Sequence, residues 1–265
     1  MDFLKEKNII GTFFINAENG HNLNTEPEAV DAVKRADSEG HIIGSHTYYH
    51  HDLFESIPKG EMELNIDMMN EKIKEIIGKT PKFFRPPLGN GGYVHQEDDP
   101  EKAKMNEKIQ KYLGASGQDI IMWGADTRDW QFEEDLEAEI NYLNKDMKKD
   151  NDTSPVNSSF IILMHDIYPT TADLTLPKVY DYVTGLGYKV VSLLECIGYE
   201  SGYQGTIVQP DVASNLNANS TVAGNNTAVE TATDRSASAT SSASFIETKM
   251  IYSILALILS IFFLY

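Results

Sequence analysis

Short apolar runs alternate with helical segments along the first 200 residues of this chain. The runs are typical of buried β-strands and fall at residues 9–15, 42–43, 83–84, 120–123, 160–164 and 189–191. Between them, apolar residues recur at helical spacing in residues 25–40, 62–76, 101–113, 136–143 and 176–186. Because parallel strands need a crossover connection, usually a helix, this order predicts an α/β fold with parallel strands, as a barrel or an open sheet.

Local signals mark the ends of two of these helices. Thr25-Glu26-Pro27-Glu28 predicts a capping box with proline in the first helical turn. Gly78 and Pro81 predict the end of the helix at residues 62–76.

The composition changes sharply after residue 205, which predicts three regions. Residues 1–205 mix apolar, aromatic and charged residues, as a globular domain does. Residues 206–249 are rich in Ser, Thr, Ala and Asn and too poor in apolar residues to offset chain entropy, so we expect a disordered stalk. Residues 250–265 are almost wholly apolar. The net charge of −18 argues against binding to nucleic acid or to an anionic membrane surface.

The C-terminal region has the pattern of a glycosylphosphatidylinositol (GPI) attachment signal. Small residues at 236–242 precede a mostly polar spacer and the apolar tail. Four N-x-S/T sequons, at Asn151, Asn157, Asn219 and Asn225, fit a secretory route to the cell surface. A plain tail anchor is the alternative. The N-terminus carries no apolar segment of a signal peptide, so either the GPI interpretation is wrong or the chain as given lacks its beginning.

Two histidines, His46 and His50, lie four residues apart in the stretch 44–53, GSHTYYHHDL. On a helical turn this spacing places both rings on one face, where two ring nitrogens can hold a divalent metal. An exposed polar turn rich in histidine has the same sequence. The metal interpretation therefore depends on the residues that accompany the pair.

Polar residues also follow other predicted strands. Arg85, Asp129 and His165 each come after an apolar run, and in a parallel barrel these strand ends share the face where active sites form. His165 then suits acid–base chemistry, with Asp129 orienting its ring and favouring the protonated form. The ordinary alternatives are a core histidine and a surface salt bridge of Arg85. Trp130 and Leu163 would wall a small apolar pocket or belong to the core.

Four ordered motifs resemble motifs two to five of the polysaccharide deacetylases. They are HTYYH at 46–50, RPPLG at 85–89, DTRDW at 126–130 and LMH at 163–165. This family, carbohydrate esterase family 4 with the NodB-homology domain, includes the fungal chitin deacetylases. The resemblance covers about residues 2–198. It implies an irregular (β/α)7 barrel that removes N-acetyl groups from chitin or a related polysaccharide with a bound divalent metal, usually zinc, with cobalt as an alternative.

The resemblance also implies roles for single residues. His46 and His50 would be metal ligands, and His165 would be the general acid that protonates the leaving amine. Asp129 would tune His165, and Arg85 would position the catalytic base.

Three further residues would contact the substrate by the same resemblance. The backbone N–H of Leu88 would help bind the oxyanion, and Trp130 and Leu163 would flank the acetyl methyl group. Many relatives have Tyr at the position of Leu88, and a backbone donor tolerates that change.

The first motif of the family, T-F-D-D-G-P, is absent from these residues. It supplies the base and a third metal ligand, and it lies on a strand upstream of residues 9–15. We therefore expect a barrel without its first strand, and a chain that is a truncated form with weak or no activity. Cys196, the single cysteine, points the same way, because relatives often pair a cysteine near this position with one near the N-terminus.

Two alternatives remain open. A non-catalytic relative that binds glycan at the cell surface would tolerate the missing motif, although it predicts decay of the remaining motifs. A different metal hydrolase would use Asp52 or His51 as its third ligand, although Asp52 also suits local turn hydrogen bonds.

Overall fold

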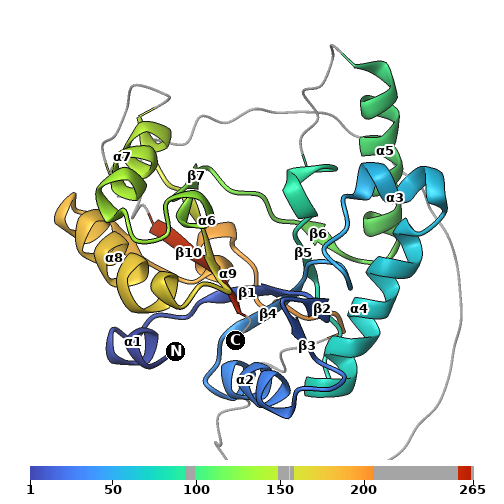
Figure 1. Ribbon diagram of the computed structural model, residues 1–265, viewed down its shortest axis with the longest axis horizontal. Helices are drawn as coiled ribbons and strands as arrows, with labels where there is room; N and C mark the ends of the chain where they lie inside the picture. The colour runs from blue at the N-terminus through green and yellow to red at the C-terminus, as the bar shows by residue number, and fades with distance from the viewer. Residues whose placement is uncertain (93–98, 149–154, 156–157, 206–255, 264–265) are drawn as a thin grey trace, which may run out of the picture. The chain divides into compact units, whose positions relative to one another are not determined.

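The computed structural model describes residues 1–92, 99–148, 155, 158–205 and 256–263. Within them, parallel strands form one sheet in the order β6-β5-β4-β1-β10-β8-β7, and β9 pairs with β10 (Figure 1). The strands are β1 (Thr12–Ile15), β4 (Ile42–Ser45), β5 (Phe83–Phe84), β6 (Asp119–Ile120), β7 (Ala125–Asp126), β8 (Ile161–Asp166), β9 (Lys189–Val190) and β10 (Ala256–Phe263). The predicted parallel α/β fold is confirmed.

Parallel pairing brings the carboxyl ends of the strands to one edge of the sheet. Ile15 lies opposite Ser45 in the β1–β4 pair, and Ser45 lies opposite Phe84 in the β4–β5 pair. The residues that follow β1, β4 and β5 therefore emerge next to one another. These are Asn16, His46 and Arg85.

Two of the predicted strands are shorter in the structure, each for a local reason. The run at residues 9–15 begins as a strand only at Thr12, because the Ile9 N–H bonds to the Leu4 carbonyl at the end of α1 (Asp2–Glu6). The run at 120–123 ends as a strand at Ile120. Beyond it, the Arg85 side chain donates to the Ile121 carbonyl at 3.0 Å and so takes an acceptor that a strand would use.

Strand β10 lies between β1 and β8. Residues 258–263 pair in register with residues 161–166, and Ser260 lies opposite Thr12. The sequence predicts an open position beside residues 9–15, where the first strand of the barrel would lie. In the structure a strand from far along the chain occupies this position. Its sequence, ALILSIFF, is almost wholly apolar.

Helices pack beside this sheet and end at recognisable signals. They are α2 (Pro27–Ser38), α3 (Leu53–Lys59), α4 (Met62–Ile77), α5 (Pro100–Ala115), α6 (Asp129–Phe132), α7 (Leu136–Met147), α8 (Leu176–Gly185) and α9 (Leu193–Ile197), together with α1. In α4 the predicted face is buried at Met62, Ile66, Met69 and Ile73. Gly78 ends α4 in the left-handed conformation, as predicted.

The predicted capping box of α2 is wrong, although Pro27 does open the helix. The N-cap is Glu26, and no side chain caps the helix there. The Glu26 carboxylate lies 2.7 Å from His21 Nδ1 instead. His21 belongs to a hairpin of β2 (Glu18–Asn19) and β3 (His21–Asn22), whose polar residues gave no strand signal.

The remaining C-terminal predictions lie largely outside the described residues. These include the stalk at 206–249 and the four sequons. Across the residues that are described, no helix has the length and apolar character needed to cross a bilayer. Cys196 is half-buried in α9 with a free thiol. Membrane anchoring through residues 250–265 remains a prediction.

Candidate active site

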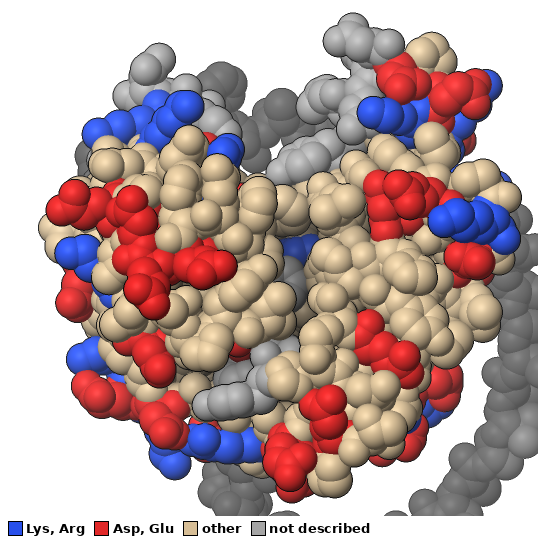
Figure 2. All heavy atoms as spheres, viewed as in Figure 1, with Lys and Arg blue, Asp and Glu red and all other residues tan. Residues whose placement is uncertain are grey.

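A cavity of about 500 Å³ opens at the carboxyl edge of the sheet. Figure 2 shows the molecule hollowed near the centre of one face, with acidic side chains on the surface around the hollow. Seven of the predicted site residues line the cavity. They are His46, His50, Arg85, Leu88, Trp130, Leu163 and His165.

The two histidines of the HTYYH motif lie side by side in the cavity wall. Their ring centroids are 4.8 Å apart, and the rings meet at 66°. The His46 Nδ1–H donates to the Arg85 carbonyl at 2.6 Å, and this tautomer carries its lone pair on Nε2. Burial lowers the pKa of both rings, that of His46 to well below its usual value. The neutral form, which binds metals, is therefore favoured.

The backbone between the two histidines is not a helical turn. His46 directly follows β4, and the residues after it form an irregular loop before α3. Thr47 and His50 have φ of 69° and 59°, the left-handed region. The two rings still lie next to each other, although the backbone between them is not helical.

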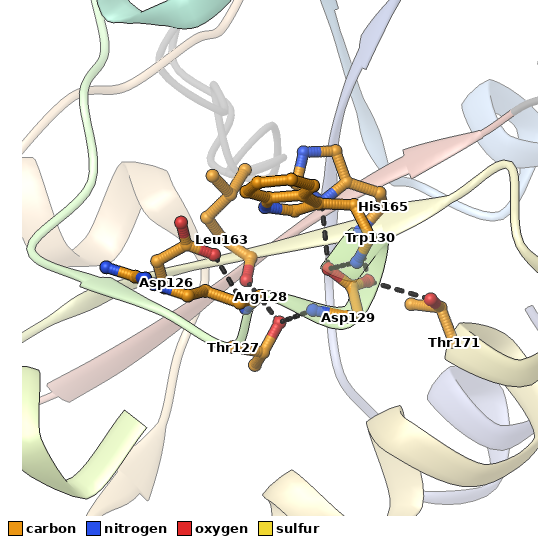
Figure 3. Close-up of polar contacts among 8 residues, drawn as sticks. All are labelled: Asp126, Thr127, Arg128, Asp129, Trp130, Leu163, His165 and Thr171. Atoms are coloured by element: carbon orange, nitrogen blue, oxygen red, sulfur yellow. Dashed lines mark hydrogen bonds and ion pairs between the residues drawn. The ribbon is translucent and has the colours of Figure 1, made fainter. Parts of the chain in front are cut away.

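His165, which also lines the cavity, forms a dyad with Asp129 (Figure 3). Asp129 is buried, and its Oδ1 accepts from His165 Nδ1 at 2.8 Å while its Oδ2 accepts from the His165 backbone N–H at 2.6 Å. The Thr171 hydroxyl also donates to Oδ2, at 2.7 Å. Burial opposes ionisation of Asp129, but these hydrogen bonds outweigh it and hold its pKa below the ordinary value. The ionised carboxylate therefore fixes the ring with Nδ1 protonated.

Arg85 is fully buried, so its side chain does not lie at the surface as the ordinary alternative requires. Its Nε donates to the Ile121 carbonyl at 3.0 Å, and its guanidinium lies over the Phe14 ring at 4.3 Å. The following prolines lead into a short 3₁₀ turn, Pro87–Gly89. Within it, Leu88 has a φ of 58°, and its side chain is 69% exposed at the cavity rim.

Apolar side chains and one carboxylate complete the wall. Leu163 is buried, whereas Trp130 is half-exposed in α6. Asp126 is the carboxylate found among the described lining residues, and burial raises its pKa. The Arg128 N–H donates to its Oδ1 at 2.8 Å (Figure 3).

The two histidine rings suit a divalent metal, because they offer two nitrogen ligands whose rings lie next to each other. Within the described part of the chain, no group of three or more His, Cys, Asp or Glu residues has metal-binding geometry. Asp52 caps α3 through the Phe54 N–H and accepts from Asn90 at 2.9 and 3.0 Å. His51 stacks on the Tyr49 ring instead of lining the cavity. Asp52 and His51 thus make contacts that do not place them beside His46 and His50 as a third metal ligand.

Several lining residues were missed at the sequence level. Asn16 directly follows β1, so the same strand-end rule that selects His46 also selects it. Asn19, Trp123 and Tyr168 carry no comparable signal. Thr171 escaped notice because it reaches Asp129 from a turn of π-helix, Thr171–Thr175.

Comparison with known proteins finds sequence similarity to deacetylases of polysaccharides. The profile of the family Polysaccharide deacetylase matches residues 1–114. A chitin deacetylase from Colletotrichum lindemuthianum is 28% identical over 199 residues, 75% of this chain and 73% of that protein. A peptidoglycan-N-acetylglucosamine deacetylase from Bacillus cereus is 31% identical over 131 residues, 49% of this chain and 40% of that protein.

The fold agrees with a solved relative. The structure of the chitin deacetylase from Colletotrichum lindemuthianum superposes with a TM-score of 0.62 at 26% identity, over 77% of this chain and 83% of that one. The α/β fold predicted from the resemblance is therefore the fold of the deacetylases. The chain is therefore similar to the polysaccharide deacetylases in both sequence and fold.

Proposed function

We propose that this protein hydrolyses the N-acetyl groups of a cell-wall polysaccharide, releasing acetate and leaving a free amine. Chitin or a related N-acetylglucosamine polymer is the proposed substrate. The observation that carries the proposal is the pairing of the His165–Asp129 dyad with two neutral histidines around one cavity. A glycan-binding protein without catalysis needs no such dyad, because a buried carboxylate and an oriented imidazole serve proton transfer.

His46 and His50 would hold the metal, zinc or cobalt, through their ring nitrogens. When bound, such a metal supplies a water of lowered pKa and polarises the acetyl carbonyl. The His46 Nδ1–H contact to the Arg85 carbonyl would fix that ring for binding, as hydrogen bonds behind metal ligands commonly do.

His165 would act as the general acid. Asp129 accepts from its Nδ1–H, so the proton delivered to the leaving amine nitrogen would come from Nε2. The Leu88 N–H would contact the developing oxyanion, and Trp130 and Leu163 would enclose the acetyl methyl group. The general base of the family lies on the Asp-Asp motif, which these 265 residues do not contain. We therefore expect weak or no activity from the polypeptide as given, and Arg85 would position a base supplied with that motif.

Zinc titration of the 265-residue polypeptide tests the metal site. Catalytic zinc sites usually have three protein ligands, and the described site offers two. We expect weak zinc binding by calorimetry, and no binding after His46→Ala. His51→Ala is the matched control and should bind like the unchanged polypeptide. Tight binding at one zinc per chain would contradict this expectation and would point to Asp126 as a further ligand.

We also propose that the protein reaches the cell surface and is held there by a GPI anchor. The support is the small-residue, spacer and apolar-tail pattern that ends at residues 250–265. A form of the protein that enters the secretory route should be released from cells by a phospholipase specific for phosphatidylinositol. Mass spectrometry should then find no residues 256–263 in the mature protein. If residues 256–263 are retained, the GPI signal is excluded. Their place in the mature protein would then be strand β10.

A further inference from the structure

The loop that joins His46 to His50 is strained. Thr47 and His50 adopt left-handed backbone conformations, with φ of 69° and 59°. Such a conformation is unfavourable in a non-glycine residue and persists only when surrounding contacts hold it in place. The distance between the two rings depends on this backbone, so contacts outside the loop must hold it.

Two contacts hold the middle of the loop. The Tyr48 N–H donates to the Asn65 carbonyl of α4 at 3.1 Å. The Tyr48 carbonyl accepts from the N–H groups of Ala17 and Glu18, at 3.0 and 2.9 Å. Both contacts fix Tyr48, which lies between the two histidines, and neither involves the carbonyl of His46 or of Thr47.

Asn16 holds those two carbonyls. Its side-chain Nδ2 donates to the His46 carbonyl at 2.5 Å and to the Thr47 carbonyl at 2.8 Å. The side chain is 3% exposed, so water does not compete for these bonds. Asn19 Nδ2 donates to Asn16 Oδ1 at 3.4 Å, which fixes the orientation of the Asn16 amide.

We propose that Asn16 is the positioning residue of the histidine pair. Its amide carries two N–H groups on one nitrogen and so bonds the carbonyl of the first histidine together with that of the strained Thr47. Aspartate has the same shape without a donor, and it would set a carboxylate against two carbonyls. This inference rests on the proposed function, because it assigns His46 and His50 to a metal.

The test compares zinc affinity in four forms of the full 265-residue polypeptide. These are the unchanged chain, Asn16→Asp, Asn16→Ser and the matched control Asn70→Ala. Asn70 also makes side-chain amide hydrogen bonds, to Gln118 at 2.9 and 3.0 Å, but it lies outside the cavity lining. We expect about 10–100-fold weaker zinc binding in Asn16→Asp, as for other residues that orient metal ligands. Asn16→Ser keeps one donor and should recover part of the affinity, and Asn70→Ala should bind like the unchanged chain.

Amide hydrogen exchange without metal supplies the second readout. Residues 46–50 should exchange faster in Asn16→Ser and Asn16→Asp, whereas exchange in α4 and β8 stays unchanged. Equal zinc affinity and equal exchange in all four forms would overturn the inference. If the unchanged chain binds no zinc, the metal role of the pair fails, and the exchange rates alone decide whether Asn16 positions the loop.

Discussion

His165→Ala should lower deacetylation of N-acetylglucosamine oligomers by about 10²–10⁴-fold, the usual contribution of a general acid or base. The comparison needs a version of the chain that carries the missing base. We would therefore extend the N-terminus by a strand with the T-F-D-D-G-P motif and measure acetate release with added zinc. The extended protein should be active, and His165→Ala in that protein should return acetate release to near background.

The unextended polypeptide provides the baseline for this experiment. We expect acetate release at background, even with added zinc or cobalt, because the described cavity offers a metal the imidazoles of His46 and His50 and has Asp126 as its single described carboxylate. Activity of the unextended polypeptide that His165→Ala removes would show that the base is already present. Asp126, whose pKa is raised by burial, would then be the first carboxylate to test.

Asp129→Asn in the extended protein should lower activity by a similar factor, about 10²–10⁴-fold. The substitution keeps the shape but leaves one acceptor oxygen for four donors. These are the His165 ring, the His165 N–H, the Thr171 hydroxyl and the Trp130 N–H. The ring then loses the partner that keeps Nδ1 protonated. Asp135→Asn, at the N-cap of α7, is the control and should leave activity unchanged.

The pH dependence of stability separates this role from a general loss of folding. The pKa of Asp129 is lower in the folded chain than in the unfolded chain. Its ionised form therefore contributes stability above the unfolded pKa, and this contribution is lost as the pH falls through the folded pKa. Thermal unfolding should show a smaller acid dependence in Asp129→Asn than in the unchanged protein. The same dependence in both would contradict the assignment of Asp129 as the ionised partner of His165.

The sequence predicts the fold class and the meeting of the site residues because both follow from strand ends. His46, Arg85 and His165 each lie at or just after the carboxyl end of a strand, and parallel pairing alone brings those ends together. No comparable rule predicts the conformation of a loop from its sequence. The left-handed conformation of Thr47 accompanies a hydrogen bond from Asn16, a residue distant in sequence, so the spacing of the two histidines does not predict the path of the backbone between them.

Long-range pairing also limited what the sequence revealed about the sheet. The segment at 250–265 has the apolar composition of a membrane signal, and composition alone does not predict that residues 256–263 pair with β1 and β8. The end of β6 at Ile120 depends on the Arg85 side chain, which arrives from the neighbouring strand. Both features depend on partners that only the folded chain brings near.

Backbone strain occurs in the loops that carry cavity-lining residues, and this sets a demand on the rest of the protein. Leu88 and Arg128 share the left-handed conformation of Thr47 and His50, with φ of 58° and 57°. At about 1–3 kcal/mol each, the four residues together approach the whole net stability of an ordinary domain, about 5–15 kcal/mol. Burial of the apolar core must therefore contribute enough free energy to offset this strain as well as the conformational entropy lost on folding. Variants that loosen the core far from the cavity would consequently reduce the amount of folded protein in a cell before they change the chemistry of the site.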